Sequence, residues 1–110
     1  MLRLEDQIEY VEDPIAIFMY ALKAPESRRQ YPGRLRVILN WLDIQGDLQQ
    51  QGKNFLSIAK SNPNLIQNKF IEFIEYQKQR AQTGEICEST IRNYYKAAKL
   101  FLEMNDVILN

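Results

Sequence analysis

The chain has 110 residues, of which 45% are hydrophobic and 25% charged, a balance typical of one globular domain. It contains no histidine and one cysteine, which removes the usual zinc sites, Ser–His–Asp and Cys–His catalysis, and a disulfide framework. No acidic run has the spacing of a calcium loop, so we expect no catalytic residues, no metal site and no cofactor.

Charge is unevenly distributed along the chain, although the formal net charge is zero. Residues 1–13 carry one basic and five acidic side chains and contain no apolar stretch of the kind found in signal peptides. Residues 23–36 carry five basic side chains and one acidic, and residues 90–102 carry three basic and none acidic. The longest apolar run, 15–22, is far shorter than the roughly 20 residues that span a bilayer. We therefore expect a cytoplasmic protein without a membrane partner.

The first predicted helix begins at Pro14, because Asp13 can cap a helix and proline suits its first position. It ends near Pro25, since proline cannot continue a helix. Apolar residues surround nearly the whole helix axis, so we expect this helix to be well buried.

The second predicted helix covers about residues 26–45. Its apolar residues recur on one face at Tyr31, Leu35, Ile38 and Leu42. Pro32 leaves two possibilities: a helix that starts near Ser27 and bends at the proline, or a turn followed by regular helix from Pro32. We favour the bent start.

A polar connection with two glycines is expected at residues 44–54, followed by a short helix at 55–61. Asn62 and Pro63 then predict the start of a helix that runs to about residue 82, with Gly84 as its C-terminal stop. The inward stripe of that helix comprises Ile66, Phe70, Phe73, Ile74 and Gln77.

The last predicted helix covers about residues 88–104, with Glu88 or Ser89 as its cap. Basic residues and Glu103 line its outer side. Its apolar face comprises Ile91, Tyr94, Tyr95, Ala98, Phe101 and Leu102. The sequence has three apolar residues at its end, Val107, Ile108 and Leu109. No later apolar residue is present against which they could pack, so we expect the natural chain to continue.

One pattern of side chains occurs in both basic segments, at residues 27–39 and 90–102, with an offset of 63. Each copy has a hydroxyl residue, an arginine, an amide and a tyrosine in the same order. The two sets are Ser27, Arg29, Gln30 and Tyr31, and Thr90, Arg92, Asn93 and Tyr94. Further basic residues, Arg36, Lys96 and Lys99, follow within the next turns.

This pattern is chemically suited to phosphate. A helix start carries free N–H groups and a partial positive charge, and a hydroxyl, an amide and an arginine can add hydrogen bonds to phosphate or base edges. We expect the tyrosines to point inward and anchor the helices. The alternative for the basic residues is a solvated helix face, and for Ser27 and Thr90 a role only as caps or first-turn residues. Cys87 is expected to be inert.

The stretch "STIRNYYKAAKLFLE" at 89–103 resembles the last helix of the N-terminal core-binding domain of tyrosine recombinases, the phage-integrase family. That helix typically reads S-x-x-T-I-R-x-Y-x-x-x-L-R-x-F-L. The stretch "APESRRQYPGRLRVILNWL" at 24–42 is similar to an earlier helix of the same domain. The resemblance covers about residues 14–106, although Pro32 and Gly33 interrupt the first motif.

The resemblance implies an all-α fold, an orthogonal bundle of four to five helices with SAM-like architecture. Residues 1–13 would then be an acidic N-terminal segment, 14–106 the core-binding domain, and 107–110 the start of a linker to an absent catalytic domain. The family cleaves DNA with a tyrosine of that other domain, so no residue of this chain is expected to be catalytic. Cys87 stands where many relatives have a capping serine, which predicts a weaker start of the last helix.

The resemblance also implies a function, namely clamping the DNA of a recombination site in the prokaryotic cytoplasm or nucleoid. Double-stranded DNA is the expected partner, with self-association on DNA through the full-length protein. The expected DNA-facing residues are Ser27, Arg28, Arg29, Arg36, Thr90, Arg92, Asn93, Lys96 and Lys99. The alternative function is a helical protein–protein interaction module whose basic helices meet an acidic partner.

Overall fold

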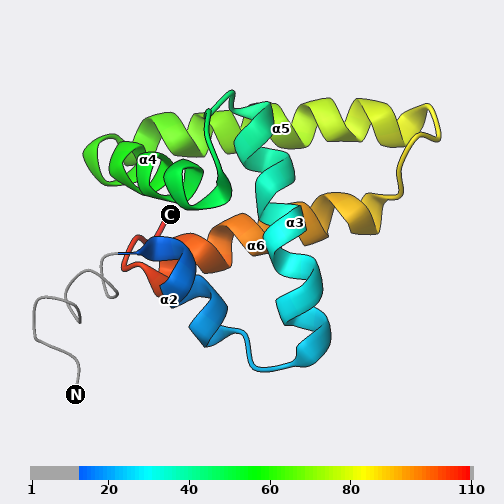
Figure 1. The fold of residues 1–110 in the computed structure, drawn as a ribbon. Helices are drawn as coiled ribbons and strands as arrows, with labels where there is room; N and C mark the ends of the chain where they lie inside the picture. Colours follow the sequence, from blue (N-terminus) through cyan, green and yellow to red (C-terminus); the bar gives the residue numbers. More distant parts are fainter. Residues whose placement is uncertain (1–12, 110) are drawn as a thin grey trace, which may run out of the picture.

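The computed structural model describes residues 13–109, which form five α-helices and no strand (Figure 1). The helices are α2 Pro14–Ala21, α3 Pro25–Trp41, α4 Leu48–Ser61, α5 Pro63–Gln82 and α6 Glu88–Met104. Figure 1 shows α3 crossing α6, while α5 runs alongside α6. The expected all-α bundle is confirmed. The acidic segment, apart from Asp13, lies outside the described residues.

Local signals set the starts of α2 and α5 as the sequence predicts. The Asp13 carboxylate accepts a hydrogen bond of 3.0 Å from the Ile15 amide. The Asn62 side chain accepts one of 3.2 Å from the Leu65 amide. Because a proline follows each cap, the first helical residue has no amide that needs a partner. Gly84, with a φ of 81°, follows the end of α5.

The prediction of a polar connection over residues 44–54, followed by a short helix at 55–61, is wrong, because α4 already begins at Leu48. Asp47 and Gln50 form a capping box, in which each backbone amide donates to the other side chain, at 3.0 and 2.9 Å. Gly52 lies inside this helix. An added Cβ there would lie 2.8 Å from Cγ1 of Ile15, so the glycine permits close approach of α4 to α2.

α3 begins at Pro25, well before Pro32, and ends at Trp41, short of the expected residue 45. The proline therefore lies inside a continuous helix, and the carbonyl of Arg28 has no amide partner four residues later. The buried side chain of Gln51 fixes the turn after α3, because its Nε2 donates to the Asn40 side chain and to the Ile44 carbonyl, each at 2.7 Å.

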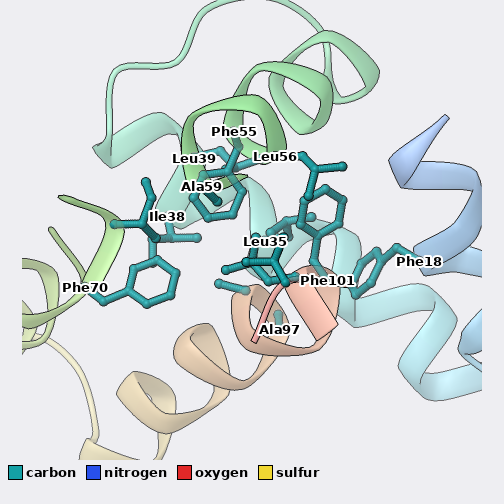
Figure 2. Packing of buried hydrophobic residues seen from close by; sticks show 14 of the residues in the cluster. Phe18, Leu35, Ile38, Leu39, Phe55, Leu56, Ala59, Phe70, Ala97 and Phe101 are labelled. Atoms are coloured by element: carbon teal, nitrogen blue, oxygen red, sulfur yellow. The ribbon is translucent and has the colours of Figure 1, made fainter. Parts of the chain in front are cut away.

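The core is built from side chains of all five helices (Figure 2). The Phe101 ring lies 5.7 Å from Phe18 and 5.9 Å from Phe55, centroid to centroid, and thereby joins α6 to α2 and α4. The expectation that α2 is well buried is confirmed, because every residue of this helix except Tyr20 is buried or half-buried. Tyr20 is 72% exposed.

The C-terminal residues also join the core. Val107 is buried, and Leu109 is half-buried against the core cluster. The expectation that they lack a packing surface is wrong, although Ile108 is exposed. The buried side chain of Asn105 donates to the Pro14 carbonyl at 3.2 Å and so ties the end of α6 to the start of α2. A linker to a further domain stays a prediction.

The two glycines inside helices differ in what surrounds them, which gives a matched pair of substitutions. Gly33 has no atom within 4 Å of a built Cβ, so Gly33→Ala should stabilise the fold by about 0.5–1 kcal/mol. Gly52→Ala should destabilise it by about 1–2 kcal/mol, because the new methyl group meets Ile15. Urea unfolding measures both, and a gain in stability for Gly52→Ala would contradict the packing of α4 on α2.

Candidate nucleic-acid interface

The repeated pattern coincides with two complete helices. α3 and α6 each have 17 residues, and their first residues, Pro25 and Glu88, are separated by the same offset of 63. Ser27 and Thr90 therefore both occupy the third helical position, which excludes them as N-caps. Of all helix pairs, α3 and α6 also make the most extensive contact.

Neither of these two helices has a side-chain cap. The N-cap residues are Ala24 and Cys87, both with extended backbone and neither with a capping hydrogen bond. The expectation that Glu88 or Ser89 caps α6 is wrong, since both lie within the helix, and the expected weak cap at Cys87 is confirmed. Pro25 has no amide, and the Thr90 amide donates to the Cys87 carbonyl at 3.1 Å. The remaining first-turn amides, those of residues 26 and 27 and of residues 88 and 89, are left for water or for an anion.

The outer side of the first turns of α3 carries a chain of polar contacts. The Glu26 carboxylate accepts hydrogen bonds from Arg29 at 2.8 Å and from Gln30 at 3.0 Å. Arg34 in turn donates to the Gln30 side-chain oxygen at 2.5 Å. The side chains of Arg29 and Glu26 are 72% and 68% exposed, and such an ion pair contributes at most about 1 kcal/mol. Arg29 can therefore exchange Glu26 for a phosphate at little cost.

Tyr31 marks the place where the basic residues of both helices meet. Its ring packs on Phe18 at 6.5 Å, which confirms its expected role as an anchor. The Arg34 guanidinium lies 5.4 Å from the centre of the ring. Tyr31 also lines a hollow of about 290 Å³ together with Lys96, Lys99, Leu100 and Glu103 of α6. Arg34 of α3 thus lies over the Tyr31 ring, and Lys96 and Lys99 of α6 line the hollow beside it. We call these four residues the Tyr31 cluster.

The equivalent tyrosine of α6 has different surroundings. The Tyr94 ring lies 6.1 Å from Phe73 of α5 and is partly buried against the core, so it is also an anchor. Arg92 does not join the Tyr31 cluster. It lines a groove between α5 and α6 of about 400 Å³ together with Lys78 and Tyr95.

The remaining expected residues differ in accessibility. Arg28 and Arg36 are exposed on α3, whereas Thr90 and Asn93 are half-buried. Arg29 and Arg36 are seven residues apart, so they share one side of α3 about 10 Å from each other along its axis. The repeated pattern does not single out Arg34 or Lys78. The spacing from Tyr31 to Arg34, three residues along a helix, is the sequence signal that could have identified the cation beside the ring.

One cationic group has a perturbed pKa. A hydrogen bond of 2.9 Å to Glu85 raises the pKa of the Arg80 guanidinium above its usual value. This pair lies across the turn that joins α5 and α6, at a distance in sequence from the Tyr31 cluster. The hydrogen bond therefore stabilises the turn between the two helices, and we assign it no catalytic role.

The described residues also bear on metal binding and on membrane insertion. Within residues 13–109, no group of three or more His, Cys, Asp or Glu side chains is placed to hold a metal ion. Every helix in that range is too short or too polar to cross a membrane.

Comparisons with known proteins add nothing to these observations, because no family model, no curated protein and no solved structure matches the chain.

The missing cap of α6 gives a direct test of its start. Cys87→Ser should stabilise the fold by about 0.5–1 kcal/mol relative to Cys87→Ala, because a serine hydroxyl can accept a hydrogen bond from the free Ser89 amide and alanine cannot. Both variants remove the same thiol, so thermal unfolding of the pair isolates the cap. Equal stability of the two variants would mean that the serine hydroxyl gains no hydrogen bond from the Ser89 amide, which contradicts an open start of α6.

Proposed function

We propose that this chain binds double-stranded DNA through α3 and α6, as the SAM-like core-binding domain of a tyrosine recombinase. The observation that carries the proposal is the Tyr31 cluster, in which Arg34 of α3 lies over the Tyr31 ring and two lysines of α6 line the hollow beside that ring. The equal lengths and equivalent starts of α3 and α6 support it, because both copies present the same residue types at the same helical positions.

The electrostatics of the described residues favour a polyanion. Residues 13–109 carry 13 basic and 10 acidic side chains, whereas the acidic excess lies in residues 1–12. Lys96 has no ion-pair partner among the residues described, and Lys99 has only a contact of 3.9 Å to Glu103. Phosphates could therefore approach these lysines without first breaking strong ion pairs.

The mechanism would be positioning on the DNA backbone, with little reading of bases. Lysines act as point charges toward phosphates, whereas Arg29 and Arg34 could form paired hydrogen bonds to phosphate or to a guanine edge. In the recombinase family the chemistry of strand cleavage belongs to a separate domain, so this chain would supply binding alone. Non-specific affinity of this kind is typically roughly 10⁻⁴–10⁻⁶ M at physiological salt.

The experiment is a titration of a labelled DNA duplex between about 50 and 200 mM salt. The test variant is Lys96→Glu with Lys99→Glu, and the matched control is Lys53→Glu with Lys60→Glu on α4, which changes the net charge equally. We expect steep salt dependence for the natural chain. The test variant should lose affinity about tenfold or more and lower the salt slope by about 2, roughly one for each phosphate contact.

The pattern of outcomes separates the possible partners. Equal losses in the test and control variants would mean that net charge alone attracts DNA, which contradicts a specific interface. An absence of binding even at low salt would contradict the proposed function and favour an acidic protein partner for the same helices. Two single variants, Arg29→Gln and Arg92→Gln, test whether both copies of the repeated pattern contribute to DNA binding. We expect each variant to lose affinity for the duplex. An unchanged affinity for Arg29→Gln would exclude the copy on α3 from the interface.

A further inference from the structure

A groove between α5 and α6 is separate from the Tyr31 cluster. It consists of two adjoining hollows, of about 400 and 170 Å³, that share Ile74 and Tyr95. Ile91 contributes a buried wall, and Ile71 stands 59% exposed at the edge. We call this surface, lined by Ile71, Ile74, Ile91 and Tyr95, the α5–α6 groove. The proposed DNA interface makes no use of its apolar lining.

The rim of the groove has an excess of positive charge. Lys78 of α5 and Arg92 of α6 both line the larger hollow, along with Glu88. Neither cation takes part in an ion pair among residues 13–109. An occupant that combines apolar side chains with carboxylates would satisfy both the lining and the rim, which is the usual chemistry of an amphipathic helix in a groove.

The chain itself enters the bundle close to one end of this groove. The carbonyl of Pro14 accepts a hydrogen bond from Asn105, and Leu109, only four residues later, lines the smaller hollow. Figure 1 shows the start of α2 and the C-terminus at the same end of the bundle. Residues 1–12 therefore attach near the groove. Twelve residues reach about 18 Å as a helix and about 40 Å when extended, enough to lie along it.

The sequence of residues 1–12 has the complementary chemistry. Leu4, Ile8 and Val11 recur at intervals of four and three, the spacing of one helical face. Glu5, Glu9 and Glu12 recur at the same intervals on the neighbouring face. A helix formed by this segment would thus carry an apolar stripe beside an acidic one.

We propose that residues 1–12 dock as an amphipathic helix in the α5–α6 groove of the same chain. Leu4, Ile8 and Val11 lie on the apolar lining, and the acidic stripe lies beside Lys78 and Arg92. The Tyr31 cluster would attract the same acidic residues, but its hollow offers only Tyr31 and Leu100 as apolar surface. The α5–α6 groove is the surface that matches both stripes.

The single cysteine provides a probe for this arrangement. Cys87 is exposed and lines a hollow that adjoins the groove at Lys78 and Glu88. A nitroxide spin label on Cys87 of the full chain should weaken the amide NMR signals of residues 1–12, because docking holds them near the label. Leu4→Ser with Ile8→Ser should restore these signals, since it removes the apolar stripe and leaves every charge.

Charge variants test the rim independently. Lys78→Glu with Arg92→Glu should restore the signals, whereas the control Lys53→Glu with Lys60→Glu on α4 should leave them weakened. Adding Glu5→Lys and Glu9→Lys to the rim variant should weaken them again, because the charge pairing is inverted and not lost. The four basic side chains of the rim and control variants, at residues 53, 60, 78 and 92, are exposed, so folding is expected to persist.

Several results would overturn the proposal. One is that the spin label leaves the signals of residues 1–12 unchanged in the natural sequence. Another is that the signals stay weakened in the variant with Leu4→Ser and Ile8→Ser. A mixture gives a third test, in which one set of chains carries the spin label and the other set is isotope-enriched but carries no spin label. If the signals of residues 1–12 weaken in this mixture, the segment lies on a second copy, which also contradicts docking within one chain. The Lys96 and Lys99 variants of the DNA titration touch no residue of the α5–α6 groove. They are read separately from the labelling experiment, so either proposal can fail while the other stands.

Discussion

The crossing of α3 over α6 is the contact on which the rest of the molecule depends. Ala97 and Ala98 of α6 are fully buried, and such small side chains let the two helices approach closely. Leu35 and Ile38 of α3 are fully buried as well. The same crossing places Tyr31 beside the lysines of α6. Loss of this contact would therefore remove the centre of the core and disperse the candidate interface at once.

The two copies of the pattern share helical positions but not neighbours. α6 packs against both α3 and α5, so its basic residues are divided between two surfaces. Lys96 and Lys99 lie beside Tyr31, whereas Arg92 lies beside Lys78. A proposed DNA interface and a proposed docking groove thus occupy different parts of one helix. This division follows from where the partner helices lie, and the repeat itself does not encode it.

Local signals in the sequence predicted the parts of the fold that depend on local chemistry. The bounds of α5 and α6 follow from Asn62, Pro63 and Gly84 and from the apolar period, and they agree with the structure. The start of α4 was missed although Asp47 and Gln50 are a local capping-box signal, because the two glycines of residues 44–54 were interpreted as part of a polar connection. Gly52 is one of these glycines. Its role is tertiary, since it makes room for Ile15. Lys78 was missed for a related reason, because its importance depends on the helix that lies beside it. Arg34 could have been found from its spacing of three residues from Tyr31 on the same helix.

The most direct test of the central claim is an NMR titration of the full chain with a DNA duplex. If α3 and α6 grip the duplex together, the backbone amides of their first turns and those around Tyr31, Lys96 and Lys99 should shift along one binding curve. The amides of α4 should stay unchanged. Shifts confined to one of the two helices, or centred on the α5–α6 groove, would contradict the account.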